Sequence, residues 1–564
     1  MEMYNCAMMK FIRLNITFIL IGLCFSQFIN QYHLSETYNV SNIYKNQRTE
    51  TLECLWPGLS IIDLKYVSND KILAGTGGGL GYFNPLNEST SGDIYFSVID
   101  SNLPSGGNPA LKVYDFNDTK MIVVSGVETI NYNGENAVTG TGISWSFNDG
   151  EWFHKDQPQD AASGYAFFDW YNQDVQYQGI NSAAKNVSYD ISVDYNQGYI
   201  YAASWAGALR RFNFQQEDSE WELVPLPMDF TPVILDGQSE LSCDQNFPNN
   251  YIYNPVDNAT GNDNHKAFSV HVQDSIIWCG TADGINKGII RSDGCIDWKH
   301  FSTDNGGLAG DWVIGFEVQY LSDTNYRLWA VSWDASTGSP IPHGLTFTDD
   351  YGLTWNKVDY FKGADNGGVS ESIVYNLYIY GDYIYVSADN GLYICDKNLD
   401  VTINENWSQV NIPFSITADL QNEKVYSTIV YEDYEKMWIG TDQGFMTTQI
   451  SDFSSWDIPR LDLINCDDET GKLIAYPNPY YTDNTQPIKF KFQTNQNNGT
   501  IDIFDFSMTR VTSSIPVNKD GEFLIGSWNG RNFNNTTVSN GTYFCRLKTS
   551  SGEYWSKLII INIK

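Results

Sequence analysis

Trp438-Ile-Gly-Thr-Asp-Gln-Gly444 is one of five copies of a short phrase that decides the fold of this chain. Each copy begins with an apolar or aromatic residue, continues with small residues, and has a Gly six positions after its first residue. The other copies are Leu73-Ala-Gly-Thr-Gly-Gly-Gly79, Tyr201-Ala-Ala-Ser-Trp-Ala-Gly207, Trp278-Cys-Gly-Thr-Ala-Asp-Gly284 and Tyr385-Val-Ser-Ala-Asp-Asn-Gly391. This pattern predicts the end of a buried strand, a tight turn with positive φ at the Gly, and a returning strand.

Two further units, at Lys120–Gly126 and Arg327–Trp333, keep the strand but lack the Gly at that spacing. With them the chain holds seven copies, roughly 47 to 58 residues apart where they are uninterrupted. A repeat of this length predicts a four-stranded antiparallel sheet, and radial closure of such sheets protects their edges. The sequence therefore predicts an all-β protein with a seven-bladed β-propeller over residues 60–460. The alternative, an open solenoid, would need capping ends, and the sequence shows none.

The charge is unevenly distributed along the 564 residues, which carry a formal total of −35. Residues 472–564 carry +4 and residues 1–26 carry +1, which leaves −40 for residues 27–471. An acidic surface of this kind disfavours nucleic acid and anionic membranes as partners. The six histidines show no metal-ligand spacing, so we expect neither a metal nor another cofactor.

The N-terminus has the pattern of a secretory signal peptide. Lys10 and Arg13 precede the apolar run Ile16–Phe25, which is too short to span a bilayer. Cleavage is expected before Gln27, and lipidation of Cys24 is the alternative. Since no later run of 18 apolar residues follows, the mature chain is expected to be exported without a transmembrane segment.

Seven cysteines remain after such cleavage, and none forms a Cys-x-x-Cys pair. Cys279 and Cys295 fall in one repeat and could meet across neighbouring strands. The odd count and the scattered placement favour buried free thiols instead, in a fold that does not depend on disulfides. The seven are Cys54, Cys243, Cys279, Cys295, Cys395, Cys466 and Cys545.

Beyond the polar linker 461–472 the pattern changes. About seven short alternating strands occupy residues 473–564, which predicts a β-sandwich. Its motifs are Tyr476-Pro-Asn-Pro479, Trp528-Asn-Gly-Arg531 and Asn540-Gly-Thr-Tyr543.

These motifs resemble the C-terminal sorting domain of type IX secretion cargo, and the immunoglobulin-like domain of the flagellar hook-capping protein. The resemblance rests on Tyr476, Pro477, Asn478, Pro479, Trp528, Gly530, Gly541 and Tyr543. One departure is Asn535-Thr-Thr-Val538, where the family usually has a Gly ahead of the Val. The resemblance implies export across the outer membrane of Bacteroidetes-like bacteria, with the secretion machinery as partner. The propeller phrase is similar to repeats of two-component-regulator propellers on sensor kinases of the same bacteria.

A second resemblance lies in Thr348-Asp-Asp-Tyr-Gly-Leu-Thr-Trp355, which looks like an Asp-box. Sialidases and xyloglucanases carry this motif on an outer turn, so the resemblance implies a structural role for Thr348, Asp350, Gly352, Thr354 and Trp355. Sialidases also clamp a carboxylate with several arginines. Only six arginines lie between Gln27 and residue 472, and no Phe-Arg-Ile-Pro phrase occurs, which argues against that activity.

Two long insertions, 156–185 and 214–263, interrupt the repeats around the third unit. Long loops on a rigid scaffold commonly carry binding. The first contains Tyr165–Tyr171, where aromatic rings lie beside polar side chains. We therefore expect Trp170 or Tyr171 to form a platform for a glycan or protein ligand, although such rings can equally belong to the core.

The sequence thus predicts a signal peptide (1–26), a lead-in (27–59), a propeller (60–460), a linker (461–472) and an immunoglobulin-like sorting domain (473–564). We expect a secreted or outer-surface protein with a non-catalytic binding or scaffolding role. The alternative is a secreted glycan-active hydrolase, which a pair of carboxylates across the central cleft would mark. The sequence assigns no catalytic residue.

Overall fold

The computed structural model describes residues 57–561 except 59, 87–94, 99, 117–118, 133, 149, 161–163, 181–184, 230–240, 257–260, 305, 323–324, 334–342, 362–371, 413–423, 432–434, 443, 458–472, 477–479, 483–486, 495 and 521–522. The expected signal peptide, nearly all of the lead-in, the linker and Pro477-Asn478-Pro479 lie outside the described residues. The chain divides into two compact units between Pro459 and Arg460, and each is described by itself.

The first unit consists of seven four-stranded antiparallel sheets, one per repeat, and an additional hairpin. In chain order, blades 1 to 7 are formed by β1 (Ile61–Ser68), β2 (Lys71–Thr76), β3 (Leu80–Phe83) and β4 (Tyr95–Ser97); β5 (Leu111–Phe116), β6 (Thr119–Tyr132), β7 (Glu135–Phe147) and β8 (Trp152–Lys155); β11 (Ser188–Asp194), β12 (Tyr199–Ser204), β13 (Ala208–Asn213) and β14 (Glu222–Leu223); β15 (Ala267–Gln273), β16 (Ile276–Thr281), β17 (Gly284–Ile290) and β18 (Ile296–Phe301); β19 (Val313–Ser322), β20 (Asn325–Ser332), β21 (Gly344–Thr348) and β22 (Asn356–Val358); β23 (Val374–Tyr380), β24 (Tyr383–Ala388), β25 (Gly391–Asp396) and β26 (Trp407–Gln409); and β27 (Ser427–Tyr431), β28 (Lys436–Thr441), β29 (Gly444–Gln449) and β30 (Asp452–Asp457).

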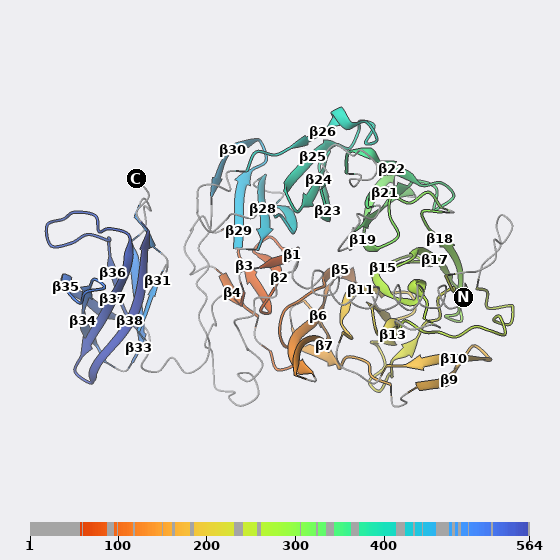
Figure 1. The fold of residues 1–564 in the computed structure, drawn as a ribbon, viewed down its shortest axis with the longest axis horizontal. Coiled ribbons are helices and arrows are strands. Elements are labelled where there is room, and N and C mark those ends of the chain that lie inside the picture. The colour runs from red at the N-terminus through yellow and green to blue at the C-terminus, as the bar shows by residue number, and fades with distance from the viewer. Residues whose placement is uncertain are drawn as a thin grey trace, which may run out of the picture. The chain divides into compact units, whose positions relative to one another are not determined.

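The first strands of the seven blades form a closed ring (Figure 1). Each contacts the first strand of the next blade, and β27 of blade 7 contacts β1 of blade 1. Among the described strands, none is shared between blades 7 and 1, because each blade is built from consecutive strands; the ring closes through packing and side-chain hydrogen bonds such as that from Ser427 to the carbonyl of Ile61. At this junction Tyr66 stacks on Tyr431, with ring centroids 6.4 Å apart. The predicted seven-bladed propeller is confirmed.

The repeated phrase forms the turn between the second and third strands of its blade. Gly79, Gly284, Gly391 and Gly444 have the predicted positive φ, with values of +146°, +107°, +134° and +119°. In three of these turns the hydroxyl of the Thr three residues earlier, such as Thr281, donates to the carbonyl of the Gly. This local hydrogen bond explains why Thr and Gly recur together.

The prediction of positive φ is wrong for Gly207. In this copy Ala208 has the left-handed backbone, with φ of 64°. A Cβ added to Gly207 would lie 2.4 Å from Oδ1 of Asn186, so the close approach of that side chain requires the glycine. Asn186 lies between the first insertion and β11, and its Oδ1 also accepts a hydrogen bond from Ser204 of the same turn at 3.1 Å.

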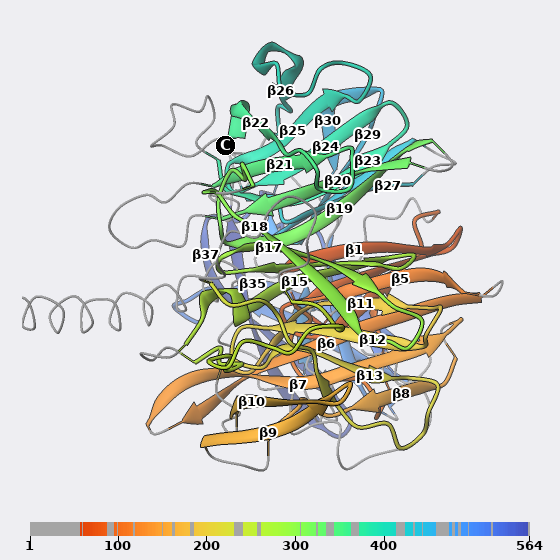
Figure 2. The ribbon, with the colours of Figure 1, turned by 90° about the vertical axis from the view of Figure 1, so that its right-hand side faces the viewer.

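The first insertion forms a two-stranded hairpin of β9 (Gly164–Trp170) and β10 (Gln173–Gly179). Figures 1 and 2 show it at the periphery of the ring, beside blade 3. The second insertion pairs with it, since Tyr253 exchanges backbone hydrogen bonds of 2.8 and 2.9 Å with Gln176 and Gln178. Three short 3-10 helices complete the described secondary structure: η3 (Asp263–His265), η4 (Asp359–Phe361) and η6 (Asn404–Asn406).

The prediction of free thiols is wrong for two cysteines. Cys243 of the second insertion forms a disulfide with Cys295, 52 positions later. The pairing of Cys279 with Cys295 is also wrong, because Cys279 is buried and free, as are Cys395 and Cys545. Cys54 and Cys466 lie outside the described residues.

The second unit is a single sheet of eight strands in the order β31-β33-β36-β35-β34-β37-β38-β32. β31 also contacts β38, so the sheet curls until it is nearly closed around a core that includes Phe490, Ile501 and Leu547. Its strands are β31 (Leu473–Tyr476), β32 (Tyr480–Tyr481), β33 (Ile488–Gln493), β34 (Asn498–Phe504), β35 (Arg510–Asp520), β36 (Phe523–Trp528), β37 (Gly541–Thr549) and β38 (Gly552–Ile561). The all-β prediction is confirmed for both units.

Candidate functional site

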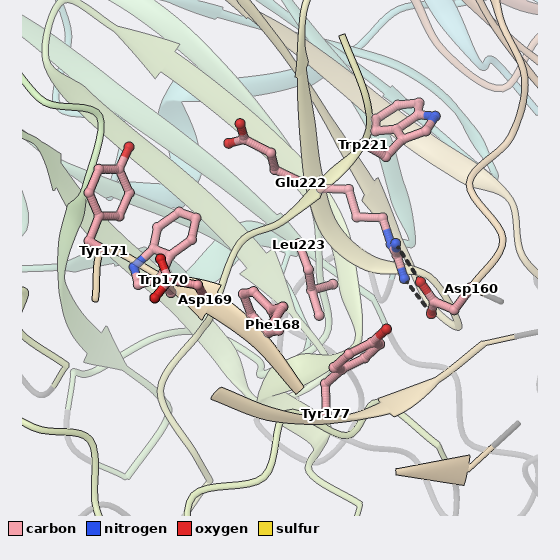
Figure 3. Close-up of a pocket in the computed structure, with 10 residues that line it drawn as sticks. Asp160, Phe168, Asp169, Trp170, Tyr171, Tyr177, Trp221, Glu222 and Leu223 are labelled. Atoms are coloured by element: carbon pink, nitrogen blue, oxygen red, sulfur yellow. Dashed lines mark hydrogen bonds and ion pairs between the residues drawn. The ribbon is translucent and has the colours of Figure 1, made fainter. Parts of the chain in front are cut away.

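A groove of about 430 Å³ lies between the hairpin β9–β10 and the outer strand β14 of blade 3 (Figure 3). We call it the hairpin groove. It is lined by Asp160, Phe168, Asp169, Trp170, Tyr171, Tyr177, Arg210, Trp221, Glu222 and Leu223. Aromatic rings and carboxylates dominate this set, which suits recognition of a ligand with both apolar and hydrogen-bonding parts.

Alternation along β9 turns Phe168 and Trp170 inward, and Asp169, next to the tight turn at the end of the strand, lines the groove as well. Phe168 is half-buried and Trp170 is 4% exposed, whereas Phe167 points outward and is 66% exposed. Trp170 and Tyr171 pack edge to face, with ring centroids 5.0 Å apart. The structure therefore places both expected platform residues at the groove, Trp170 largely beneath its surface and Tyr171 at its edge.

Arg211 of β13 holds this wall of the groove in place. Its guanidinium donates to Glu222 at 2.8 Å and to the hydroxyl of Tyr171 at 3.0 Å. It also lies over the ring of Trp170, 5.0 Å from the centroid. Burial opposes the charge of Arg211, but the nearby Tyr201 and Glu222 outweigh it and raise its pKa. The arginine therefore stays charged, and its role is to hold Glu222, Tyr171 and Trp170 in place.

Arg210, the residue directly before Arg211, points to the opposite face of β13 and closes the groove at its other end. It forms a bidentate pair with Asp160, with N–O distances of 3.0 and 2.8 Å. Both side chains are less than a tenth exposed. Burial and the charge of Asp160 raise the pKa of Tyr177, although Arg210 lowers it, so this phenol stays protonated near neutral pH.

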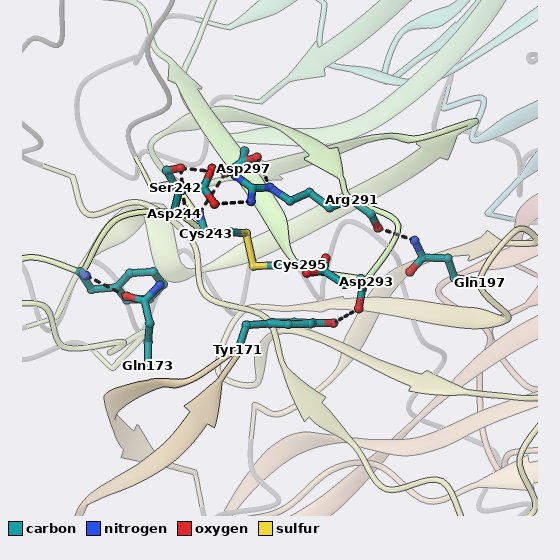
Figure 4. The surroundings of a disulfide bond; sticks show 12 residues. Tyr171, Gln173, Gln197, Ser242, Cys243, Asp244, Arg291, Asp293, Cys295 and Asp297 are labelled. Carbon is teal, nitrogen blue, oxygen red and sulfur yellow. Dashed lines mark hydrogen bonds and ion pairs between the residues drawn. A yellow bond between two sulfur atoms is a disulfide. The ribbon is translucent and has the colours of Figure 1, made fainter.

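The disulfide braces the same wall from blade 4 (Figure 4). The turn before Cys295 presents the carbonyl of Asp293 to the hydroxyl of Tyr171 at 2.8 Å. It also presents the carbonyl of Gly294 to Arg211 at 2.7 Å. On the other side of the bond, Arg291 forms a bidentate pair with Asp244 at 2.7 and 2.8 Å. Blades 3 and 4 and the first insertion thus meet at Tyr171, and the disulfide ties the second insertion to the same turn of blade 4.

A second cluster of charges lies on first strands that face the propeller axis, and we call it the axial cluster: Asp63, Lys65, Lys112, Asp190 and Glu317. Two of its carboxylates are paired with lysines, Asp63 with Lys65 at 2.8 Å and Asp190 with Lys112 at 3.0 Å. Burial raises the pKa of Glu317, although Lys65 and Lys112 lower it. Because β19 belongs to blade 5, this coupling reaches across the ring to blades 1 and 2.

The segment that resembles an Asp-box, Thr348–Trp355, lies on the turn between β21 and β22. Asp350 accepts hydrogen bonds from the amide and hydroxyl of Thr354, at 2.8 and 2.6 Å, and from Thr348. Burial would raise the pKa of Asp350, but these bonds outweigh it and lower the pKa. Trp355 packs against Trp278 of blade 4, and Gly352 has a φ of +85°. The segment thus contacts neither the hairpin groove nor the axial cluster in any described interaction.

The described residues of the motif that resembles a sorting domain stabilise turns of the second unit. Trp528 is buried and its Nε1 donates to the carbonyl of Arg531 at 2.8 Å. Tyr543 is buried and its hydroxyl donates to Ser539 at 2.8 Å. Gly530 and Gly541 have positive φ, and Tyr476 ends β31.

Sequence reasoning missed Asp160, Arg210, Trp221 and Glu222 as groove residues, and it missed Arg211 behind the groove wall. Two adjacent arginines inside an otherwise apolar strand were the available signal, since buried arginines need partners. Across the described ranges, no cluster of three or more His, Cys, Asp or Glu side chains is arranged to hold a metal ion. The described part of the chain also contains no helix that is long and apolar enough to cross a membrane.

No protein-family model matches the chain, and no curated protein sequence matches it. Among solved structures it is similar to PorZ, a surface component of the type IX secretion system of Porphyromonas gingivalis, with 13% identity, 89% of this chain and 82% of that chain covered, and a TM-score of 0.27. The chain is also similar to the extracellular domain of the putative one-component system BT4673 from B. thetaiotaomicron, with 11% identity, 89% of this chain and 81% of that chain covered, and a TM-score of 0.27. A third similar structure is the propeller domain of Cps50 (Swd1) from Myceliophteria thermophila, with 11% identity, 72% of this chain and 97% of that chain covered, and a TM-score of 0.37. Because these TM-scores are low, the class of the protein, a seven-bladed β-propeller, rests on its seven sheets.

Proposed function

We propose that this chain is an exported, non-catalytic binding protein whose ligand site is the hairpin groove. The observation that carries the proposal is the construction of the groove: aromatic and carboxylate side chains on a wall held by Arg211 and the disulfide. Preformed sites of this kind lose little entropy when a ligand binds. The insertions that build the groove are also the largest departures from the repeat.

The disulfide Cys243–Cys295 supports the exported location, since such bonds persist mainly outside the reducing cytosol. We further propose that residues 473–564 form an immunoglobulin-like sorting domain for type IX secretion, on the strength of the motif around Trp528 and Tyr543. Deletion of residues 472–564 should then leave the propeller folded in the periplasm, with an unchanged melting temperature. Normal arrival of the truncated chain in the medium would remove the sorting role.

Binding is tested on glycan and peptide arrays with the wild-type chain and with Leu223→Trp, which fills the groove. Leu353→Trp is the matched control, because Leu353 is 79% exposed on the Asp-box turn. We expect Leu223→Trp to lose the signals that Leu353→Trp keeps. Equal signals from all three proteins would place the ligand elsewhere.

The alternative function, a glycan-active hydrolase, is favoured by one observation in the axial cluster. Burial raises the pKa of Glu317, which also interacts electrostatically with Asp63, and two carboxyl groups in different surroundings are the pattern of a general acid with its partner. Two ion pairs argue against this function, because Asp63 is already bound by Lys65 and Asp190 by Lys112. A reducing-sugar assay on polysaccharides with wild type and Glu317→Gln decides this: activity that Glu317→Gln abolishes would establish the hydrolase.

A further inference from the structure

We propose that the hairpin groove selects a positively charged group, an alkylammonium or guanidinium, as carried by a lysine or arginine side chain of a peptide. This inference rests on the proposed binding function and names its ligand class. It follows from the state of each charged side chain in the groove, taken in turn.

The two arginines nearest the ligand space, Arg210 in the lining and Arg211 behind the wall, are already neutralised. Asp160 binds Arg210 through both oxygens, and a third N–H of Arg210 donates to the carbonyl of Gly207 at 2.8 Å. Arg211 donates to Glu222, Tyr201, Tyr171 and the carbonyl of Gly294. The Arg211 side chain is only 1% exposed. A carboxylate or phosphate ligand would have to displace buried ion pairs, which is costly.

The carboxylates of the groove outnumber these cations by one. Asp160, Asp169 and Glu222 line the groove together with Arg210, and Arg211 lies buried behind its wall. Counted together, these five ionised side chains carry a net charge of −1. Glu222 is 47% exposed and uses Oε2 for Arg211, which leaves its other oxygen at the groove surface. Asp169 is exposed, and its Oδ1 accepts a 3.3 Å hydrogen bond from the backbone amide of Asn172 in the tight turn between β9 and β10. A ligand cation therefore meets oxygens that can still accept hydrogen bonds.

The aromatic lining favours the same ligand. Trp170, Tyr171, Tyr177 and Trp221 all line the groove, and the carboxylate of Glu222 points toward the side on which Tyr171 and Trp170 lie (Figure 3). Aromatic faces attract cations, and the groove wall already uses this interaction, since Arg211 lies 4.3 Å from the ring centroid of Tyr199. A neutral oligosaccharide could stack on these rings but would gain less from the surplus carboxylate.

The test is calorimetric titration of the full chain with matched probes. These are a lysine peptide, its arginine counterpart, the same peptide with N-acetyl-lysine, spermidine, and a neutral xyloglucan oligosaccharide. We expect the lysine and arginine peptides to bind, and lysine acetylation to weaken binding by about tenfold or more, as loss of a charge-assisted contact should. Spermidine binding equal to that of the peptides would identify a free amine as the ligand, with the charge selectivity intact.

Glu222→Gln and Asp169→Asn should each weaken the lysine peptide by about tenfold. Asp169→Asn leaves the pair of Arg211 and Glu222 intact, so it remains informative if Glu222→Gln unfolds. Asp174→Asn is the control, because Asp174 is an exposed carboxylate of the same hairpin that does not line the groove. Its affinity should equal that of wild type.

The outcomes separate this inference from the proposed function. If the neutral oligosaccharide binds and Leu223→Trp abolishes that binding while the cationic probes fail, the groove is a ligand site of the wrong charge class and the inference is overturned. If cationic probes bind equally to wild type, Glu222→Gln and Asp169→Asn, general attraction to an acidic protein explains them, which also overturns it. If no probe depends on the groove, the proposed function falls as well.

Discussion

Arg211 and Tyr171 lie 40 positions apart in the sequence, yet the guanidinium of Arg211 donates a 3.0 Å hydrogen bond to the hydroxyl of Tyr171. That hydroxyl in turn donates to the carbonyl of Asp293. Blade 3, the hairpin and the outer turn of blade 4 are thus linked through one phenol. The position of the groove wall depends on this link.

Arg211→Gln should lower the free energy of unfolding by about 2–4 kcal/mol, because it removes a buried charge with four hydrogen-bonding partners. Denaturant unfolding measures the loss. Lys120→Gln is the control, since its pair with the exposed Asp115 should be worth less than about 1 kcal/mol. Equal losses of unfolding free energy in the two variants would show that Arg211 does not stabilise the groove wall.

Loss of the disulfide in Cys243→Ser/Cys295→Ser should cost about 2–4 kcal/mol, given the 52 residues that separate the two cysteines. The reason is the larger conformational freedom of the unfolded chain. A reducing agent should lower the melting temperature of wild type and leave that of the double variant unchanged. Sensitivity of the double variant to reduction would mean that another pair of cysteines is bonded.

Asp350→Ala should lower stability by about 1–3 kcal/mol, because Thr348 and Thr354 lose the acceptor that organises their turn. Ligand binding at the groove should be unaffected. Melting curves and the array signals are measured together. An unchanged melting temperature with lost binding would place the Asp-box in a functional site.

His265 should make stability fall in acid. Burial holds its pKa at about 3, below the value of about 6.5 for an exposed histidine. Nδ1 accepts the amide of Asn254 and Nε2 donates to Leu226, so the folded state requires the neutral ring. The stabilisation is complete above about pH 6.5 and is lost as the pH falls toward the folded-state value, by up to about 1.4 kcal/mol per pH unit.

Unfolding measured from about pH 7.5 to about pH 5 should therefore show a shallower pH dependence for His265→Asn than for wild type. The slope should not vanish, because burial lowers the pKa of His271 to about 3 as well. Parallel curves for the two proteins would contradict the assignment of a buried neutral ring to His265.

The propeller could be predicted from the sequence because its signals are local and repeated. The hydroxyl of Thr281 and the positive φ of Gly284 lie within one turn, so the same residues recur wherever the turn recurs. Gly207 is the exception, because Asn186, which lies between the first insertion and β11 and outside the repeated phrase, approaches it closely.

The groove could not be predicted, because its contacts join segments that follow no repeat. The partners of Arg210 and Arg211 lie in different segments, Asp160 50 positions away and Glu222 11 positions away. The disulfide was hidden for the same reason, since Cys243 belongs to an insertion and Cys295 to a blade. Counting cysteines could not reveal which of them the fold brings together.

Hydrogen exchange of the full chain, with and without the strongest array ligand, tests most directly whether the hairpin groove is the binding site. The account predicts slower exchange in β9, β10 and β14, with the first strands of the blades unchanged. Slower exchange confined to β1, β5, β11 and β19, around the axial cluster, with no change at the hairpin, would contradict it.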